Sequence, residues 1–172
     1  PRITSDIKKP IAVIRMNNNG CISKLNLTEY PCKTMDIKQA IQTRRSVKHY
    51  DPAHQMTEAE VNELMEHAIL SPTAFNIQHW RFVRVKDAEK RQQILEAAWG
   101  QAQVVDSSLL LVLCADLNAW EKQPERYWQH APQAAQNAIL PAIENYYTNH
   151  HQGQRDECVR SASIAAMNIM LM

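Results

Sequence analysis

The most informative part of this sequence is Ser71-Pro72-Thr73-Ala74-Phe75-Asn76-Ile77-Gln78-His79-Trp80. Before it, apolar residues recur at helical spacing through residues 61–69, and after it Trp80–Val85 alternates in the manner of a strand. Pro72 ends the helix, because proline lacks a backbone N–H and its ring collides with the preceding turn. We therefore expect Ser71–Gln78 to form an irregular, exposed loop that joins a helix to a strand.

A second informative stretch is Arg44-Arg45-Ser46-Val47-Lys48, which follows a short helical pattern capped by Asp36. Its three cations and one hydroxyl suit a phosphate group. The chain has only 3 glycines, so it contains neither a G-x-G-x-x-G motif nor a Walker loop that could cradle phosphate with backbone N–H groups. A bound nucleotide would therefore be held by side chains. The alternative is a solvated charge run at a helix end, where cations also suit the helix dipole.

The remaining patterns alternate between helix and strand. A capping box at Thr57–Glu60 starts the helix before the loop. The run Leu109–Cys114 is continuously apolar, which indicates a strand buried on both faces and a buried Cys114 thiol. Further helices are predicted over residues 87–99, 132–147 and 156–172. This order predicts a mixed α/β layer fold whose sheet is flanked by helices.

Composition limits the class of protein. The chain has 172 residues, 45% hydrophobic and 22% charged, which is typical of one soluble globular domain. Its longest apolar run, Leu109–Ala115, is too short to cross a membrane. The 4 cysteines show no close pair, so we expect free thiols in a reducing cytoplasm. No cysteine or histidine spacing indicates a metal site.

Charge is unevenly distributed along the chain. Residues 1–34 carry six basic and two acidic side chains, a net +4, whereas the remainder has thirteen basic and sixteen acidic ones, a net −3. Because residues 1–34 lack a long helical or alternating pattern and Met35 begins a helix, we expect a non-native or disordered extension there and a domain over 35–172. A nucleic-acid binder is disfavoured, because residues 35–172 are acidic overall and their aromatic residues are not interleaved with cations.

Four pieces in this order resemble the nitroreductase family of FMN-dependent oxidoreductases. They are Arg44–Lys48, the Ser71–Trp80 loop entering a strand, Asp106 before the Leu109–Cys114 strand, and Arg160-Ser161-Ala162-Ser163-Ile164-Ala165-Ala166-Met167-Asn168. The resemblance covers residues 35–172. It implies an α+β sandwich with a central mixed sheet flanked by helices, and a homodimer with FMN in the subunit interface. It also implies NAD(P)H as electron donor to small electrophilic acceptors such as nitroaromatics or quinones.

The resemblance also assigns roles to residues. It implies that Arg44 and Ser46 contact the FMN phosphate and ribityl chain, with Arg45 beside them, and that Lys48 approaches the pyrimidine edge of the flavin. A cation there would stabilise the negative charge of the reduced ring. The loop would reach the flavin of the partner subunit through Pro72, Thr73, Ala74, Asn76 and Gln78, the last two by amide hydrogen bonds. No protein nucleophile is expected, because the cofactor performs the chemistry.

Two departures from the family pattern leave an alternative open. Relatives commonly have Asn and Lys where this chain reads Gly100-Gln101-Ala102-Gln103, and Gln103 can hydrogen-bond the ring but carries no charge. The last helix reaches Met172 without a stop signal, and the family continues beyond this point, so we expect a missing C-terminal part. The alternative function is a non-catalytic flavin or anion-binding module, or a degraded family member. His79 is assigned no role.

Overall fold

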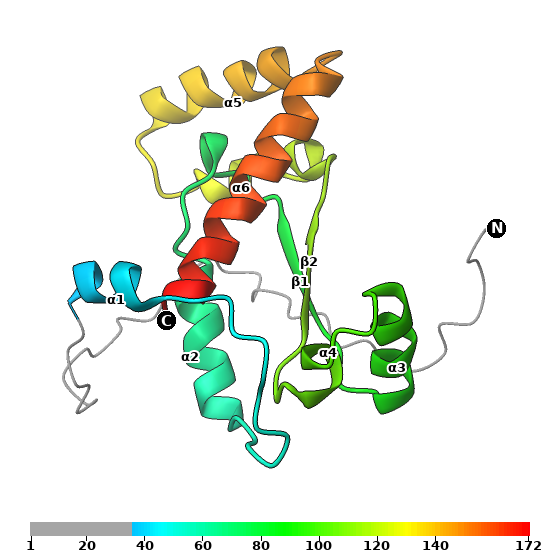
Figure 1. Cartoon of the computed structure of the whole chain (residues 1–172). Helices are drawn as coiled ribbons and strands as arrows, with labels where there is room; N and C mark the ends of the chain where they lie inside the picture. Colours follow the sequence, from blue (N-terminus) through cyan, green and yellow to red (C-terminus); the bar gives the residue numbers. More distant parts are fainter. Residues whose placement is uncertain (1–35) are drawn as a thin grey trace.

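The computed structural model describes residues 36–172 (Figure 1). The expectation for residues 1–34 lies outside this range. The helices and strands are α1 Ile37–Thr43, α2 Glu58–Ala68, η1 Ala74–Asn76, β1 Trp80–Arg84, α3 Ala88–Ala97, α4 Gln103–Asp106, β2 Leu111–Ala115, η2 Ala119–Glu121, η3 Pro124–Tyr127, α5 Gln133–Tyr147 and α6 His151–Leu171.

The start of α2 is fixed by its own sequence, as predicted. The Thr57 hydroxyl accepts a hydrogen bond from the Glu60 N–H at 3.2 Å, and the Glu60 carboxylate accepts one from the Thr57 N–H at 2.7 Å. This reciprocal pair satisfies two N–H groups that the helix cannot pair internally. An N-cap of this kind contributes about 1 kcal/mol. The predicted capping box is confirmed.

The sheet within residues 36–172 is an antiparallel pair of strands, β1 and β2. Trp80 lies opposite Ala115 and Arg84 opposite Leu111, and the pairing continues where the Val85 N–H donates to the Leu110 carbonyl at 2.9 Å. Side chains alternate across the sheet. Trp80 and Phe82 are therefore buried on one face.

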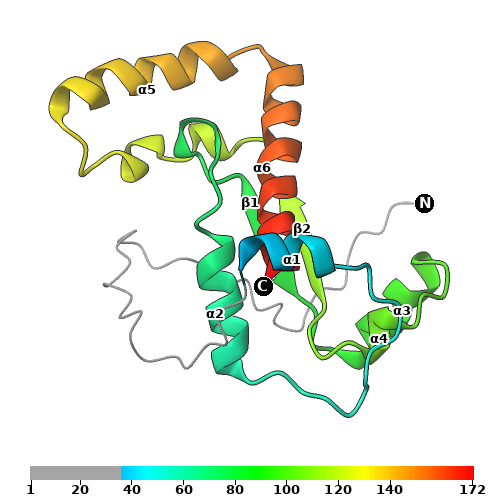
Figure 2. The same cartoon turned by 60° about the vertical axis from the view of Figure 1, so that its left-hand side comes forward.

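The long helix α6 lies across the antiparallel pair β1 and β2, which we call the hairpin, and beside α2 in both views (Figures 1 and 2). A hydrophobic core fills the space between these elements. Its buried members are Met65, Ala68, Trp80, Phe82 and Ala165. The small Ala165 side chain allows α6 to approach the sheet closely, while larger side chains of α2 and β1 close the sides of the core. This packing fixes the orientation of α6, which carries part of the site described below.

A second core lies at the other end of the hairpin, under α5. Its buried members are Ile77, Ala119, Ile143 and Tyr147. Trp120 stacks on the Tyr147 ring with centroids 5.7 Å apart. Helices α3 and α4 lie at the opposite end of the hairpin from α5 in both views (Figure 2). Because Ile77 is fully buried here, the loop that precedes β1 is anchored in this second core.

The apolar run before residue 115 does not form the fully buried strand that we expected. None of the residues of β2 is buried, Val112 is 39% exposed, and Cys114 is exposed. Leu111 and Leu113 pack on the first core, but the alternate residues point away from α6. One face of this strand is covered by α6 and the other is not covered within residues 36–172, so the prediction of a buried Cys114 was wrong.

The last helix begins earlier than predicted. We expected it from residue 156, whereas α6 starts at His151. Asn149 adopts a left-handed turn with φ 58°, and the Gln154 side chain donates to the Tyr147 carbonyl at 2.8 Å. The first turn of α6 is thus tied to the end of α5 by a contact that helical periodicity alone does not reveal.

Candidate functional site

The loop before β1 has a strained backbone. Phe75, Asn76 and Gln78 have φ values of 52°, 55° and 55°. These values fall in the left-handed region, which residues other than glycine rarely adopt. The Thr73 hydroxyl accepts a hydrogen bond from the Gln78 N–H at 3.0 Å, and the Thr73 carbonyl accepts one from the Asn76 N–H at 3.1 Å. Clustered strain of this kind is characteristic of ligand-binding segments.

Contacts at both ends hold this loop in place. The Ser71 hydroxyl donates to the Ala68 carbonyl at 2.6 Å and accepts from the Asn168 side chain at 2.7 Å. On the far side, the Trp128 indole N–H donates to the Phe75 carbonyl at 3.0 Å. Ser71 and Ile77 are buried, so the loop is less exposed than its sequence indicated. The segment is therefore rigidly positioned between α6 and η3.

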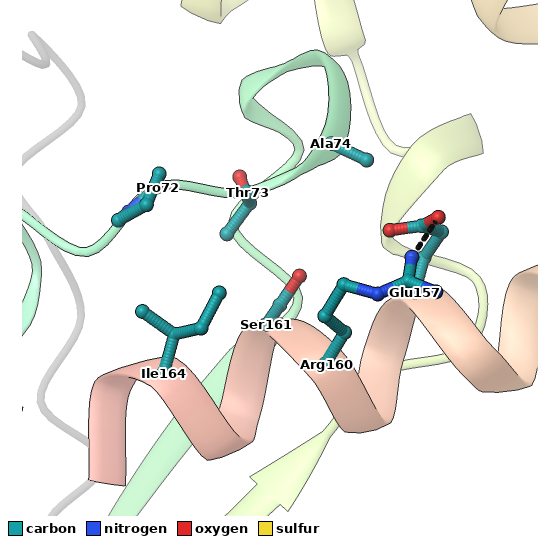
Figure 3. A pocket seen from close by; sticks show the side chains of 7 residues that line it. All are labelled: Pro72, Thr73, Ala74, Glu157, Arg160, Ser161 and Ile164. Atoms are coloured by element: carbon teal, nitrogen blue, oxygen red, sulfur yellow. Dashed lines mark hydrogen bonds and ion pairs between the residues drawn. The ribbon is translucent and has the colours of Figure 1, made fainter. Parts of the chain in front are cut away.

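A pocket of about 270 Å³ lies between this loop and the middle of α6 (Figure 3). Pro72, Thr73 and Ala74 form one wall. The opposite wall comes from α6 and consists of Glu157, Arg160, Ser161 and Ile164. At its mouth Arg160 pairs with the Glu157 carboxylate, and its side chain remains 60% exposed.

A buried serine and histidine pair adjoins the pocket. The Ser161 hydroxyl lies 3.3 Å from His79 Nδ1, and the two residues are 1% and 0% exposed. Burial lowers the pKa of His79, despite the opposing charges of Glu157 and Asp116, so its imidazole is neutral near pH 7. Among the described residues, His79 Nε2 has no hydrogen-bond partner. No local sequence pattern assigns His79 a role, because its partner lies 82 residues away.

The basic stretch follows α1 and faces solvent. Arg44 is half-buried, whereas Arg45, Ser46 and Lys48 are exposed. One guanidinium nitrogen of Arg45 donates to the carbonyls of Gln42 and Arg44, both at 2.8 Å. Within residues 36–172, none of the three cations forms an ion pair. The stretch thus carries positive charge that no carboxylate of the described chain neutralises, which suits a phosphate dianion.

The structure does not bring all predicted site residues together. Pro72, Thr73 and Ala74 line the pocket, but the basic stretch does not, and α1 lies beside the C-terminal end of α6 rather than its middle (Figures 1 and 2). Asn76 is exposed, and its side-chain oxygen accepts from the Gln78 amide at 3.2 Å. The other amide atom of Gln78, Oε1, is buried without a hydrogen-bond partner in the described chain.

The Gln103 amide donates to the Gln101 side chain at 2.8 Å, in α4 and away from this pocket.

The residues of the α6 wall were not predicted as site residues. Glu157, Arg160, Ser161 and Ile164 are spaced by three or four positions, so they share one helical face. That spacing is readable in the sequence, but it does not say which face meets a ligand. The position of the loop opposite α6 supplies this information.

A larger polar cavity of about 500 Å³ lies near the start of α2 and α3. Its cations are already engaged. Glu58 pairs with Arg84 at 2.8 Å and with Lys86 at 3.2 Å, and the Arg91 guanidinium donates to the carbonyls of Val85 at 3.0 Å and of Ser107. We therefore interpret these contacts as structural.

Two negative findings apply to residues 36–172 alone. No helix in this range has the length and hydropathy that a membrane crossing requires. In the same range, no three His, Cys, Asp or Glu side chains gather in a way that could hold a metal ion.

The chain belongs to the nitroreductase family, because the model of that family matches residues 41–172. It is 49% identical to the protein DrgA of Synechocystis over 137 residues, which cover 80% of this chain and 65% of DrgA. It is 34% identical to YodC of Bacillus subtilis, assigned as an NAD(P)H nitroreductase, over 80% of this chain and 69% of that protein. The chain thus spans about two thirds of the length of these relatives.

A solved structure confirms the fold class. An Exiguobacterium sibiricum protein, assigned as a nitroreductase and solved in complex with FMN, superposes with a TM-score of 0.72 and 27% sequence identity. The match covers 80% of this chain and 69% of that one. The predicted α+β class, with helices flanking a sheet, is therefore confirmed.

Proposed function

We propose that this protein is an FMN-dependent oxidoreductase that transfers hydride from NAD(P)H through the flavin to small electrophilic acceptors such as nitroaromatics or quinones. The observation that carries the proposal is the strained, anchored loop whose residues Pro72, Thr73 and Ala74 wall a pocket against α6. Family membership, a relative assigned as an NAD(P)H nitroreductase and a similar structure in complex with FMN support the same reading.

The residues present fit FMN at its phosphate end. Arg44, Arg45 and Lys48 carry charge that no described carboxylate neutralises, and Ser46 adds an exposed hydroxyl. We infer that Arg44 and Ser46 hold the phosphate and ribityl chain with Arg45 beside them. Lys48 then lies near the pyrimidine edge of the ring, where its charge favours the reduced, anionic form over the oxidised one.

The ring end of the site involves the loop. Pro72, Thr73 and Ala74 supply an uncharged wall, and Asn76 and Gln78 supply amide groups. Gln78 Oε1 is a buried acceptor that lacks a hydrogen-bond partner in the described chain, and such an atom is costly unless something donates to it. We infer that these five residues contact the flavin of the partner subunit. When bound, FMN supplies the hydride chemistry, while the chain orients the ring and excludes water.

A homodimer accounts for the separation of the two residue groups. Within one chain the basic stretch does not line the loop pocket, so a site made of both groups requires two copies. Exposed apolar side chains on α1 and α6 offer a surface for such an interface. They include Ile37 at 69%, Ile41 at 56%, Val159 at 53% and Met170 at 52%. We also propose that the working domain starts at residue 35 and that the protein is cytoplasmic.

The test is reconstitution with FMN. The purified chain should bind FMN, turn yellow and bleach anaerobically when NAD(P)H is added, and reoxidise with a quinone. Substitution of Arg44 and Arg45 by Gln should weaken FMN binding at least tenfold, since charge-assisted hydrogen bonds to phosphate are lost. The matched control is Arg155→Gln, an exposed arginine on α6 that does not line the pocket. A chain that remains colourless in excess FMN contradicts the proposal.

The second candidate is a non-catalytic flavin or anion-binding module. The uncharged Gln103, bonded to Gln101 instead of facing the loop pocket, favours it. Stoichiometric FMN binding without NAD(P)H oxidation on any acceptor would support this candidate and exclude the first.

A further inference from the structure

The Ser161 hydroxyl is placed between the pocket and a buried imidazole. Ser161 belongs to the α6 wall, and in Figure 3 its side chain rises from the helix toward the loop. Its one hydrogen bond in the described chain is to His79 Nδ1, at 3.3 Å. A serine hydroxyl has one proton and two lone pairs, so the direction of this hydrogen bond decides what Ser161 can offer a ligand.

The surroundings of His79 indicate that direction. A neutral imidazole carries its proton on only one nitrogen. Nε2 is buried and lacks a partner in residues 36–172, and buried N–H donors without a partner are rarer than buried acceptors without one. The proton therefore belongs on Nδ1, where it can be donated to Ser161 Oγ. The Ser161 proton is then free to point into the pocket.

Charged groups around the pair are consistent with a neutral imidazole. The carboxylates of Glu157 and Asp116 favour protonation of His79, but burial and the guanidinium of Arg81 oppose it, and the net effect is a lowered pKa. The other groups beside the ring are uncharged. Tyr147 packs with its centroid 6.0 Å away, and Cys158 donates its thiol proton to the Asp116 carbonyl.

We propose that the Ser161 hydroxyl donates a hydrogen bond to a conjugated carbonyl of the pocket ligand, and that His79 is the positioning residue that orients it. This inference rests on the proposed function, because the flavin ring and a quinone acceptor both present such a carbonyl. Ser161 then selects flat rings that carry an oxygen acceptor at this edge. Only 1% of Ser161 is exposed, so its hydroxyl is already shielded from bulk water by the protein.

The first experiment reads the position of the proton without any ligand. In ¹⁵N-labelled protein, two-dimensional NMR of the imidazole nitrogens distinguishes the two tautomers, and the His79→Asn variant identifies the His79 signal by its loss. We expect a protonated Nδ1 and a bare Nε2. A protonated Nε2, or an imidazolium at pH 7, overturns the proposal whether or not the chain binds FMN.

The second experiment uses three variants whose folding is checked by circular dichroism. Ser161→Ala removes the donor. His79→Asn keeps an amide N–H at the position of Nδ1, whereas His79→Gln moves the amide to the position of Nε2. We expect Ser161→Ala and His79→Gln to weaken ligand binding about five- to tenfold, which is the effect of one neutral hydrogen bond. The His79→Asn variant should retain most of the wild-type affinity.

The two sources of the carbonyl are separated by what is measured. A raised Kd for FMN assigns the carbonyl to the flavin, and a raised KM for menadione at saturating FMN, with unchanged FMN affinity, assigns it to the acceptor. Either result supports the proposal. If Ser161→Ala changes neither constant, or if His79→Asn behaves like His79→Gln, the proposal is wrong. A wild-type chain that binds no FMN refutes the proposed function, and the NMR result still tests the orientation of the hydroxyl.

Discussion

Replacement of Tyr147 by phenylalanine is expected to stabilise the protein. Tyr147 is 0% exposed, and its Oη has no hydrogen-bond partner among residues 36–172. The hydroxyl has therefore lost its hydration without gaining a protein partner, and burial raises its pKa so that it stays protonated. The substitution removes only this oxygen. The ring keeps its stacking on Trp120 and its edge contact with Phe75.

The magnitude follows from two opposing terms. A buried hydroxyl without a partner costs about 1–3 kcal/mol. Removal of its oxygen atom leaves a small void, which costs roughly a few tenths of a kcal/mol. The net gain in the free energy of unfolding is about 1 kcal/mol. For a chain of this size that raises Tm by about 2–4 °C.

Thermal and urea unfolding, followed by circular dichroism, measure the effect. The matched control is Tyr146→Phe at the neighbouring position, where the hydroxyl is exposed to solvent and only weakly bonded to Glu157 at 3.4 Å. That variant should change the stability by less than about 0.5 kcal/mol. If Tyr147→Phe lowers the free energy of unfolding by 1 kcal/mol or more, then Oη has a favourable partner and the reasoning fails.

Three further predictions concern charge and thiol chemistry. Lys48→Met should lower the reduction potential of bound FMN and slow its reduction by NAD(P)H; an unchanged potential in spectroelectrochemical titration contradicts the role given to Lys48. Burial raises the pKa of the Asp116 carboxyl, but the hydrogen bond from Lys122 at 2.8 Å and nearby positive charge outweigh it and lower that pKa below its ordinary 3.8. Its contribution to stability is thus present above pH 3.8 and lost as the pH falls further, and Lys122→Gln should reduce this loss in acid-unfolding curves. Iodoacetamide should label the exposed Cys114 far faster than Cys158, whose pKa burial raises to about 11; equal rates in peptide mass mapping would refute the assigned burial.

Features that depend on neighbouring residues were predicted from the sequence. The capping box at Thr57 and Glu60, the end of α2 before Pro72 and the strand from Trp80 all follow from contacts within a few positions. The loop was located correctly for the same reason, because proline and the change from helical to alternating periodicity mark its ends. Its left-handed residues were not predicted, since no glycine marks them in the sequence.

Features that depend on distant segments could not be predicted. Cys114 lies in an apolar run that reads as buried, but its exposure depends on which elements cover β2. His79 gains its significance from Ser161, which is distant in the sequence and close only because α6 crosses the hairpin. The pocket has the same origin. Its loop wall was predicted as a binding segment, and its α6 wall required the packing of α6 against α2 and the sheet.

The hydrogen bonds of the Arg91 guanidinium affect how this part of the protein unfolds locally. This side chain reaches from α3 to the carbonyls of Val85, Val105, Ser107 and Ser108. Val85 directly follows β1, and the other three residues lie in α4 or between α4 and β2. One residue thus fastens a peripheral pair of helices to the sheet at several points. The contact with Val105 joins α3 to α4, so fluctuations that detach both helices together must break the contacts with Val85, Ser107 and Ser108 at the same time. We therefore expect α3 and α4 to exchange their amide hydrogens as one cooperative unit and not as independently fraying turns.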